Sequence, residues 1–178
     1  MTLTIHQILS ATDVGPNQPV MLKAGPTTVR YENGDIRYIR LGDTEILRRV
    51  YAAIRDQNWG TVPFTIKNEN IVQHEASFTV TYDAHFQQPG IDYYAKCSIT
   101  GSSEGDIVFR FEGEARSDFK RNRIGFCVLH PMDLAGDDCT IEYVDGRTEA
   151  GCFPQNIQGI LRWLIPDRSG PFGNGRAG

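Results

Sequence analysis

Hydrophobic and polar residues alternate through the middle of the chain. The alternation is clearest in residues 77–86, where Phe78, Val80, Tyr82, Ala84 and Phe86 are interleaved with Thr79, Thr81, Asp83 and His85. Successive side chains of a strand point to opposite faces of a sheet, so this period of two predicts a strand with one buried and one polar face.

The same pattern recurs along most of the chain and predicts an all-β protein. The further predicted strands are 20–23, 27–31, 36–41, 62–66, 71–74, 93–100, 107–119, 123–130 and 140–144. Asn33-Gly34 separates two of them and predicts a tight hairpin, because both residues tolerate positive φ. The largely apolar run 123–130 predicts a central strand covered on both faces and stopped by Pro131. Many short strands divided by turns are typical of an antiparallel β-sandwich, a class that includes the mutarotase-like supersandwich.

Residues 44–57 fit two interpretations. Helical spacing is present at Ile46, Leu47, Val50, Tyr51 and Ile54, and periodicity alone favours a helix there. A strand is the alternative, with Ile46, Val50, Ala52 and Ile54 on one face.

Changes in pattern divide the chain into three parts. Residues 1–19 contain Gly15-Pro16 and predict a leader without regular structure. Residues 20–154 carry the strand pattern and predict the β-sandwich domain. From residue 155 to residue 178 the alternation is lost and glycine becomes frequent, which predicts an irregular, non-native or disordered tail.

Composition and charge narrow the classes of function. A hydrophobic content of 40% and a charged content of 22% are ordinary for a globular domain. The net charge is −4 with both signs mixed, which argues against a nucleic-acid partner. The first residues resemble neither a signal peptide nor a membrane span, so we expect a cytoplasmic protein. Its four cysteines should then be reduced and buried, and without a C-x-x-C pair we expect no metal and no cofactor.

Three segments together resemble one enzyme family. They are IRYIR at 36–40, EILRRVYAAIRDQNWGTVP at 45–63 and EARSDFKRNRIGFCVLHP at 114–131. The combination is similar to the N-terminal region of the D-apionate lactonases, bacterial enzymes that open D-apionolactone to D-apionate in D-apiose catabolism. The resemblance covers residues 20–154 and favours the strand for 44–57.

The resemblance implies a carboxylic-ester hydrolase, a lactonase, whose catalytic acids lie on a further barrel-type domain. Because the sequence departs from the family pattern after Pro154, we expect this chain to be a fragment that lacks the catalytic domain. That missing C-terminal domain is the expected partner, and an apolar docking patch should face it. Activity of the chain alone is an open question.

His130 is a candidate for contact with the substrate. Lactone hydrolysis requires an activated water or nucleophile and a stabilised oxyanion, but no G-x-S-x-G, H-E-x-x-H or P-loop motif occurs. The catalytic residues are therefore unknown. A histidine at a strand end can bind a sugar hydroxyl or act as a base; a structural histidine that caps the strand is the favoured alternative.

Two polar clusters are further candidates for binding a sugar lactone or sugar acid. The first is Arg121, Asn122 and Arg123. The second is a polar and aromatic cluster that contains Asp56, with Arg55 and Trp59 as its candidate binding residues. Arginine and asparagine present forked donors that suit hydroxyls and carboxylates, although arginines in a solvated turn commonly pair with neighbouring carboxylates. Tryptophan can stack on a sugar ring, but beside a glycine it is more often an anchor in a core or an interface.

Two rival functions remain open. A free-standing carbohydrate-binding or mutarotase-like domain without hydrolase activity would require a concave sheet face on which His130 and the arginines converge. A structural or interaction module would require no such site.

Overall fold

The computed structural model describes residues 18–155. The predictions for residues 1–17 and 156–178, which include nearly all of the leader and the tail, lie outside the described residues. The chain divides into two compact units, Met1–His130 and Pro131–Gly178, and each is described by itself. The two sheets of the sandwich lie within the first unit, and the domain boundary at residue 154 stays a prediction.

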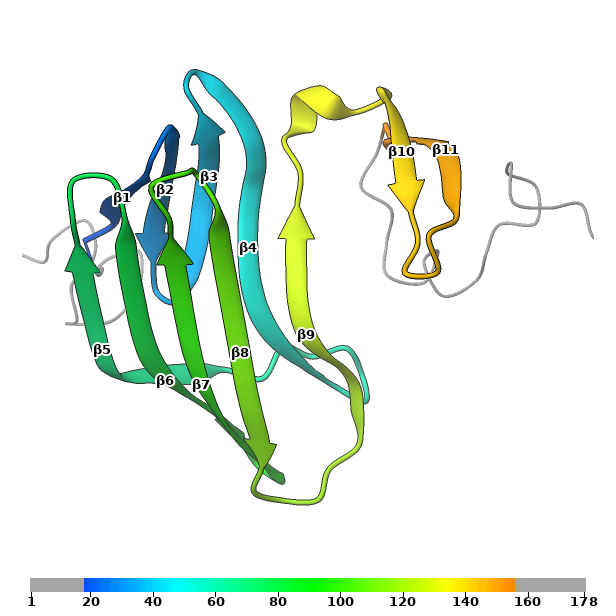
Figure 1. Ribbon diagram of the computed structural model, residues 1–178. Coiled ribbons are helices and arrows are strands. Elements are labelled where there is room, and N and C mark those ends of the chain that lie inside the picture. The colour runs from blue at the N-terminus through cyan, green and yellow to red at the C-terminus, as the bar shows by residue number, and fades with distance from the viewer. Residues whose placement is uncertain (1–17, 156–178) are drawn as a thin grey trace, which may run out of the picture. The chain divides into compact units, whose positions relative to one another are not determined.

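The first unit contains two antiparallel sheets. Sheet A has the strand order β1-β2-β3-β4-β9 and sheet B has the order β5-β6-β7-β8. The strands of sheet A are β1 (Val20–Ala24), β2 (Thr27–Glu32), β3 (Asp35–Leu41), β4 (Thr44–Asp56) and β9 (Arg121–Leu129). Those of sheet B are β5 (Phe64–Gln73), β6 (Phe78–Gln88), β7 (Ile91–Gly101) and β8 (Ile107–Ala115). The two sheets face each other in Figure 1, which confirms the all-β antiparallel sandwich.

The core lies between the sheets and follows the alternation of the sequence. On β6, every second residue from Phe78 to Phe86 is buried, and the register places these residues beside the buried positions of β7. The largest fully buried side chains are Phe86, Leu22, Ile36, Ile54, Ile99, Val29, Val62 and Val80.

The segment 44–57 is a strand, although its periodicity favours a helix. Its first half pairs with β3 and its second half with β9. Ala52 and Ile54 face the core, and Ile54 is fully buried. Pairing and burial on both sides of β4 therefore override the local periodicity.

Strand β9 differs from its prediction. It lies at the edge of sheet A, and none of its residues is fully buried. The prediction of a central strand covered on both faces is wrong. Its apolar residues face the neighbouring edge of sheet B, where the Phe126 ring lies 4.8 Å from Phe109 and 6.3 Å from Phe111 between centroids.

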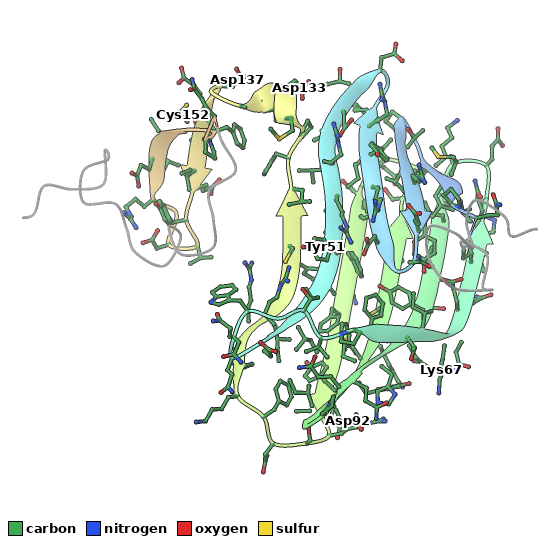
Figure 2. The ribbon with its side chains drawn as sticks, turned by 180° about the vertical axis from the view of Figure 1, so that it is seen from behind. Tyr51, Lys67, Asp92, Asp133, Asp137 and Cys152 are labelled. Carbon is green, nitrogen blue, oxygen red and sulfur yellow. The ribbon has the colours of Figure 1, made fainter. Side chains whose placement is uncertain are left out.

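The second unit is a small hairpin preceded by a short 3₁₀ helix. The helix is η1 (Met132–Leu134), and the strands are β10 (Asp138–Glu142) and β11 (Thr148–Cys152). Two hydrogen bonds close the base of the hairpin, from Gly136 N to Phe153 O at 3.0 Å and from Phe153 N to Asp137 O at 2.9 Å. Figure 2 labels Asp133, Asp137 and Cys152 in this unit.

The four cysteines are free thiols, but only Cys97 is buried. Cys127 and Cys139 are half-buried and Cys152 is exposed, so the expectation that all four are buried is wrong. Burial raises the pKa of Cys97 to about 11. Within residues 18–155, no helix is long and apolar enough to cross a membrane.

Candidate functional site

Five of the six predicted binding residues belong to the same end of sheet A. Strand β4 ends there and β9 begins there, and the antiparallel register places Arg55 opposite Arg123 and Asp56 opposite Arg121. Asn122 lies between the two arginines of β9. Trp59 belongs to the turn that follows β4.

Asp56 organises the turn that contains Trp59. Its Oδ1 atom accepts hydrogen bonds from the backbone N–H groups of Asn58 and Gly60, both at 2.8 Å. These two bonds lower the pKa of Asp56 below its usual 3.8, so the carboxylate is ionised at neutral pH. Trp59 adopts a positive φ of 66° within this turn. A Cβ on Gly60 would lie 2.7 Å from Oδ2 of Asp56, so a side chain at that position would require the Asp56 carboxylate to shift.

The two arginines that face each other across β4 and β9 make different contacts. Arg55 donates to the hydroxyl of Thr61 and, at 3.4 Å, to that of Tyr51. Arg123 donates to the backbone carbonyl of Phe126 at 3.0 Å, rather than to a neighbouring carboxylate. Figure 2 labels Tyr51 on β4, beside β9. Hydroxyls and a carbonyl position these guanidinium groups. Because these acceptors are uncharged, the contacts do not neutralise the positive charges.

A hollow of about 400 Å³ lies at this end of the sandwich. It is lined by three chain segments, Asp56–Asn58, Gln88–Ile91 and Phe119–Lys120. Asp56 and Gln88 connect two of them through a hydrogen bond of 3.3 Å. None of the six predicted residues lines the hollow, although Arg55 and Arg121 directly adjoin lining residues in the sequence.

His130 lies away from this cluster. It follows the last residue of β9, whereas Arg121 is the first. Nine residues of extended strand span about 30 Å at roughly 3.3 Å per residue. The free-standing carbohydrate-binding alternative requires His130 and the arginines to converge on one face. The structure does not bring them together.

Comparison with known families identifies the relationship. Residues 7–161 match the family described as D-apionate lactonase, N-terminal domain. The chain belongs to this family. It is also 33% identical over 143 residues to the D-apionate lactonase of Brucella anthropi, which covers 79% of this chain and 24% of the relative. The chain thus spans about a quarter of the length of that relative. No solved structure matches the chain.

Among the described residues is a histidine–carboxylate pair that the sequence pattern did not single out. His85 Nε2 lies 2.9 Å from Asp92 Oδ1, at the β6–β7 hairpin. Figure 2 labels Asp92 there. Ser117 lies close by, but its Oγ accepts from the backbone N–H of Asp92 and donates to the carbonyl of Gly90. The hydroxyl is therefore engaged by the backbone and is not activated by the imidazole.

The domain also has a polar hollow that sequence reasoning missed. It has a volume of about 510 Å³ and lies on the face of sheet B that points away from the core. Alternation identified the polar positions of 77–86 one strand at a time. The signal that could have revealed the hollow is the register, which aligns the polar positions of β6, β7 and β8.

The cluster at the end of sheet A is suited to binding polar ligands. Among residues 18–155, no group of three or more His, Cys, Asp or Glu side chains is placed to hold a metal ion. The cluster at the end of sheet A offers guanidinium donors and one ionised carboxylate, which suit the hydroxyl and carboxylate groups of a sugar acid.

Proposed function

We propose that this domain is the N-terminal part of a hydrolase that opens D-apionolactone to D-apionate, and that it supports a catalytic part of the same enzyme. Family membership carries this proposal, because residues 7–161 match the N-terminal domain of D-apionate lactonases. The curated relative is a D-apionate lactonase about four times as long as the matched region. The remaining three quarters of that length can hold the catalytic groups. The four free thiols suit a cytoplasmic enzyme.

An open apolar side of the sandwich supports the second half of the proposal. Strands β8 and β9 are neighbouring edges of the two sheets, and among residues 18–155 no further strand pairs with the outer side of either. We call this side the β8–β9 seam and define it by Phe109, Phe111, Ile124, Phe126 and Val128. The first four are only partly buried, and Val128 is 48% exposed.

The proposed occupant of the β8–β9 seam is the C-terminal part of the same enzyme. Unpaired strand edges and half-exposed aromatic rings are unfavourable in water and are usually covered in the intact protein. The relative supplies a long chain that has no counterpart in the matched region. If that chain covers the seam, this domain would pack against the catalytic part and form one wall of its pocket.

The test is hydrolysis of D-apionolactone by three samples. They are this chain, the Brucella anthropi lactonase without its matched region, and a fusion in which this chain replaces that region. We expect turnover by the fusion and none by this chain alone, because the catalytic groups lie in the part that is added. Hydrolysis by this chain alone would contradict the proposal.

A matched pair of substitutions in the fusion tests the β8–β9 seam. Phe126→Asp places a charge among the seam rings and should lower the activity at least tenfold by separating the two parts. Lys23→Ala, on an exposed position of β1, should leave activity unchanged. Equal activity of the two variants would reject the seam as the docking side.

A further inference from the structure

The hollow on sheet B is formed by polar side chains in successive rows. The register aligns Asp83, Lys96 and Glu112 in one row across β6, β7 and β8. The next row consists of Thr81, Ser98 and Arg110. Neighbouring strands lie about 4.8 Å apart, so each row presents donors and acceptors at a spacing comparable to the size of one sugar unit.

One acceptor of the hollow is fixed by an irregularity of β5. Two residues of β5, Asn68 and Glu69, stand opposite the single residue Tyr82, which makes a β-bulge. Asn68 adopts a positive φ of 53° there, and its Nδ2 donates to Asp83 Oδ2 at 2.6 Å. Asparagine tolerates this conformation better than most residues. The bulge therefore directs an amide over the sheet and holds the Asp83 carboxylate in place.

Tyr94 gives the same carboxylate a second donor. The hydrogen bonds from Asn68 and from the Tyr94 hydroxyl lower the pKa of Asp83, so it stays ionised. The Tyr94 ring carries the Arg116 guanidinium at 4.1 Å from its centroid. Since this cation covers one side of the ring, hydrogen-bonding groups are more available to a ligand in the hollow than a ring face for stacking.

On the outer face of sheet A, several arginines form ion pairs with carboxylates. Arg30 there pairs with Glu32 at 3.3 Å, and Arg49 pairs with Asp35 at 2.5 Å. On sheet B, by contrast, the side chains of Arg110 and Glu112 make no hydrogen bond or ion pair with any residue in the part of the chain that the structure describes. These two side chains on the outer face of sheet B therefore remain available to a ligand.

The charges of the hollow indicate the class of ligand. Asp83 and Glu112 balance Lys96 and Arg110, so neither a polyanion nor a cation is favoured. Hydroxyl groups both donate and accept, and they fit an array in which donors and acceptors alternate. We propose that the outer face of sheet B binds a polyhydroxylated ligand, a sugar or sugar acid, with Asp83 and Glu112 as acceptors and Lys96 and Arg110 as donors.

This binding site is additional to the proposed function. The proposed function is used only to choose the ligands with which the site is tested. The site lies on another face from the Arg55–Arg123 cluster and from the β8–β9 seam. Because the hollow is shallow and leaves much of a small ligand in water, we expect a dissociation constant of about a millimolar. A lactonase fusion that turns over substrate while the hollow binds nothing would reject this inference alone.

The test is titration of the full chain, labelled with ¹⁵N, by D-apiose, D-apionate and acetate, followed by amide chemical shifts. We expect saturable shifts confined to β6, β7 and β8 with D-apiose or D-apionate. Binding of both indicates recognition of hydroxyls, and binding of D-apionate alone indicates that Lys96 or Arg110 engages its carboxylate. The same shifts with acetate, shifts elsewhere, or no shift at about 50 mM ligand would overturn the proposal.

Substitutions then assign the shifts to the hollow. Arg110→Ala and Glu112→Ala each remove one unpartnered group from an exposed position and should weaken binding at least fivefold. Lys23→Ala removes a charge from an exposed position on sheet A and should leave binding unchanged. Unfolding temperatures of the three variants verify that each is folded. If Arg110→Ala and Glu112→Ala bind as tightly as the unsubstituted chain, the hollow is not the site.

Discussion

Asp56 links the charge of one side chain to the shape of the turn beside the arginine cluster. Its carboxylate accepts from two backbone N–H groups, and these bonds favour the ionised form. The pKa in the folded protein is therefore below the value of about 3.9 in an unfolded chain. The contribution to stability is fully present above about pH 4 and is lost as the pH falls through the folded pKa.

Substitution of Asp56 should change how stability depends on pH. We expect Asp56→Asn to unfold at a lower urea concentration than the unsubstituted chain at pH 6. The difference should shrink as the pH falls from 6 to about 3, because the stabilisation by the ionised carboxylate is lost as the pH falls through the lowered pKa of the folded protein. Urea unfolding followed by circular dichroism at both pH values measures the difference. A difference that stays constant with pH would show that ionised Asp56 does not stabilise the turn.

Residue types alone are enough to locate part of the candidate site. Charged and forked side chains at 55 and 121–123 indicate a polar cluster, and antiparallel pairing unites them. His130 shows the limit of that reasoning, because its chemistry suits a site but its position at the far end of β9 is set by strand direction. The hydrogen bond from Asn68 to Asp83 depends on a bulge in which Asn68 has a positive φ, and no sequence motif predicts that conformation.

At the scale of elements, the β2–β3 hairpin tests how strongly a turn depends on glycine. Asn33 and Gly34 have φ values of 50° and 78°, as the Asn-Gly signal predicts. Gly34 also adjoins the core, because its carbonyl accepts from the Tyr82 hydroxyl at 2.8 Å. A Cβ there would lie 3.0 Å from that hydroxyl oxygen and 3.2 Å from Ile66.

Two alanine substitutions separate backbone strain from crowding in these turns. Gly42→Ala adds a Cβ at φ 57° with no atom within 4 Å, so it should cost about 1–2 kcal/mol of unfolding free energy from strain alone. Gly34→Ala should cost more, because it also displaces Tyr82. Equilibrium urea unfolding compares the two. Equal losses would show that the Tyr82 contact adapts without cost.

Strands are predictable where alternation is strict and are misjudged where tertiary pairing decides. The strand at 77–86 is confirmed because its pattern specifies both faces. The segment 44–57 shows helical spacing, yet its pairing with β3 and β9 makes it a strand. β9 has the composition of a central strand but lies at an edge, because its apolar residues face the rings of β8.

At the scale of the whole molecule, the β8–β9 seam should make the isolated chain associate. Val128 is 48% exposed on an open strand edge, and such edges pair with other chains. We expect concentration-dependent oligomers in sedimentation velocity, reduced by Val128→Lys. Met21→Lys is the matched control, since Met21 is 58% exposed on β1 at the other edge of sheet A. A monomer at every concentration, or equal effects of the two substitutions, would contradict this expectation.

The two partners of β4 are synthesised at different times during translation. β3 precedes β4 in the chain and can pair with its first half at once, but β9 is made only after the whole of sheet B. Translation of residues 57–129 at roughly 5–20 residues per second takes about 4–15 s. During that interval the edge of β4 that later pairs with β9 has no partner strand. The growing polypeptide must therefore keep this edge from other nascent chains until β9 emerges.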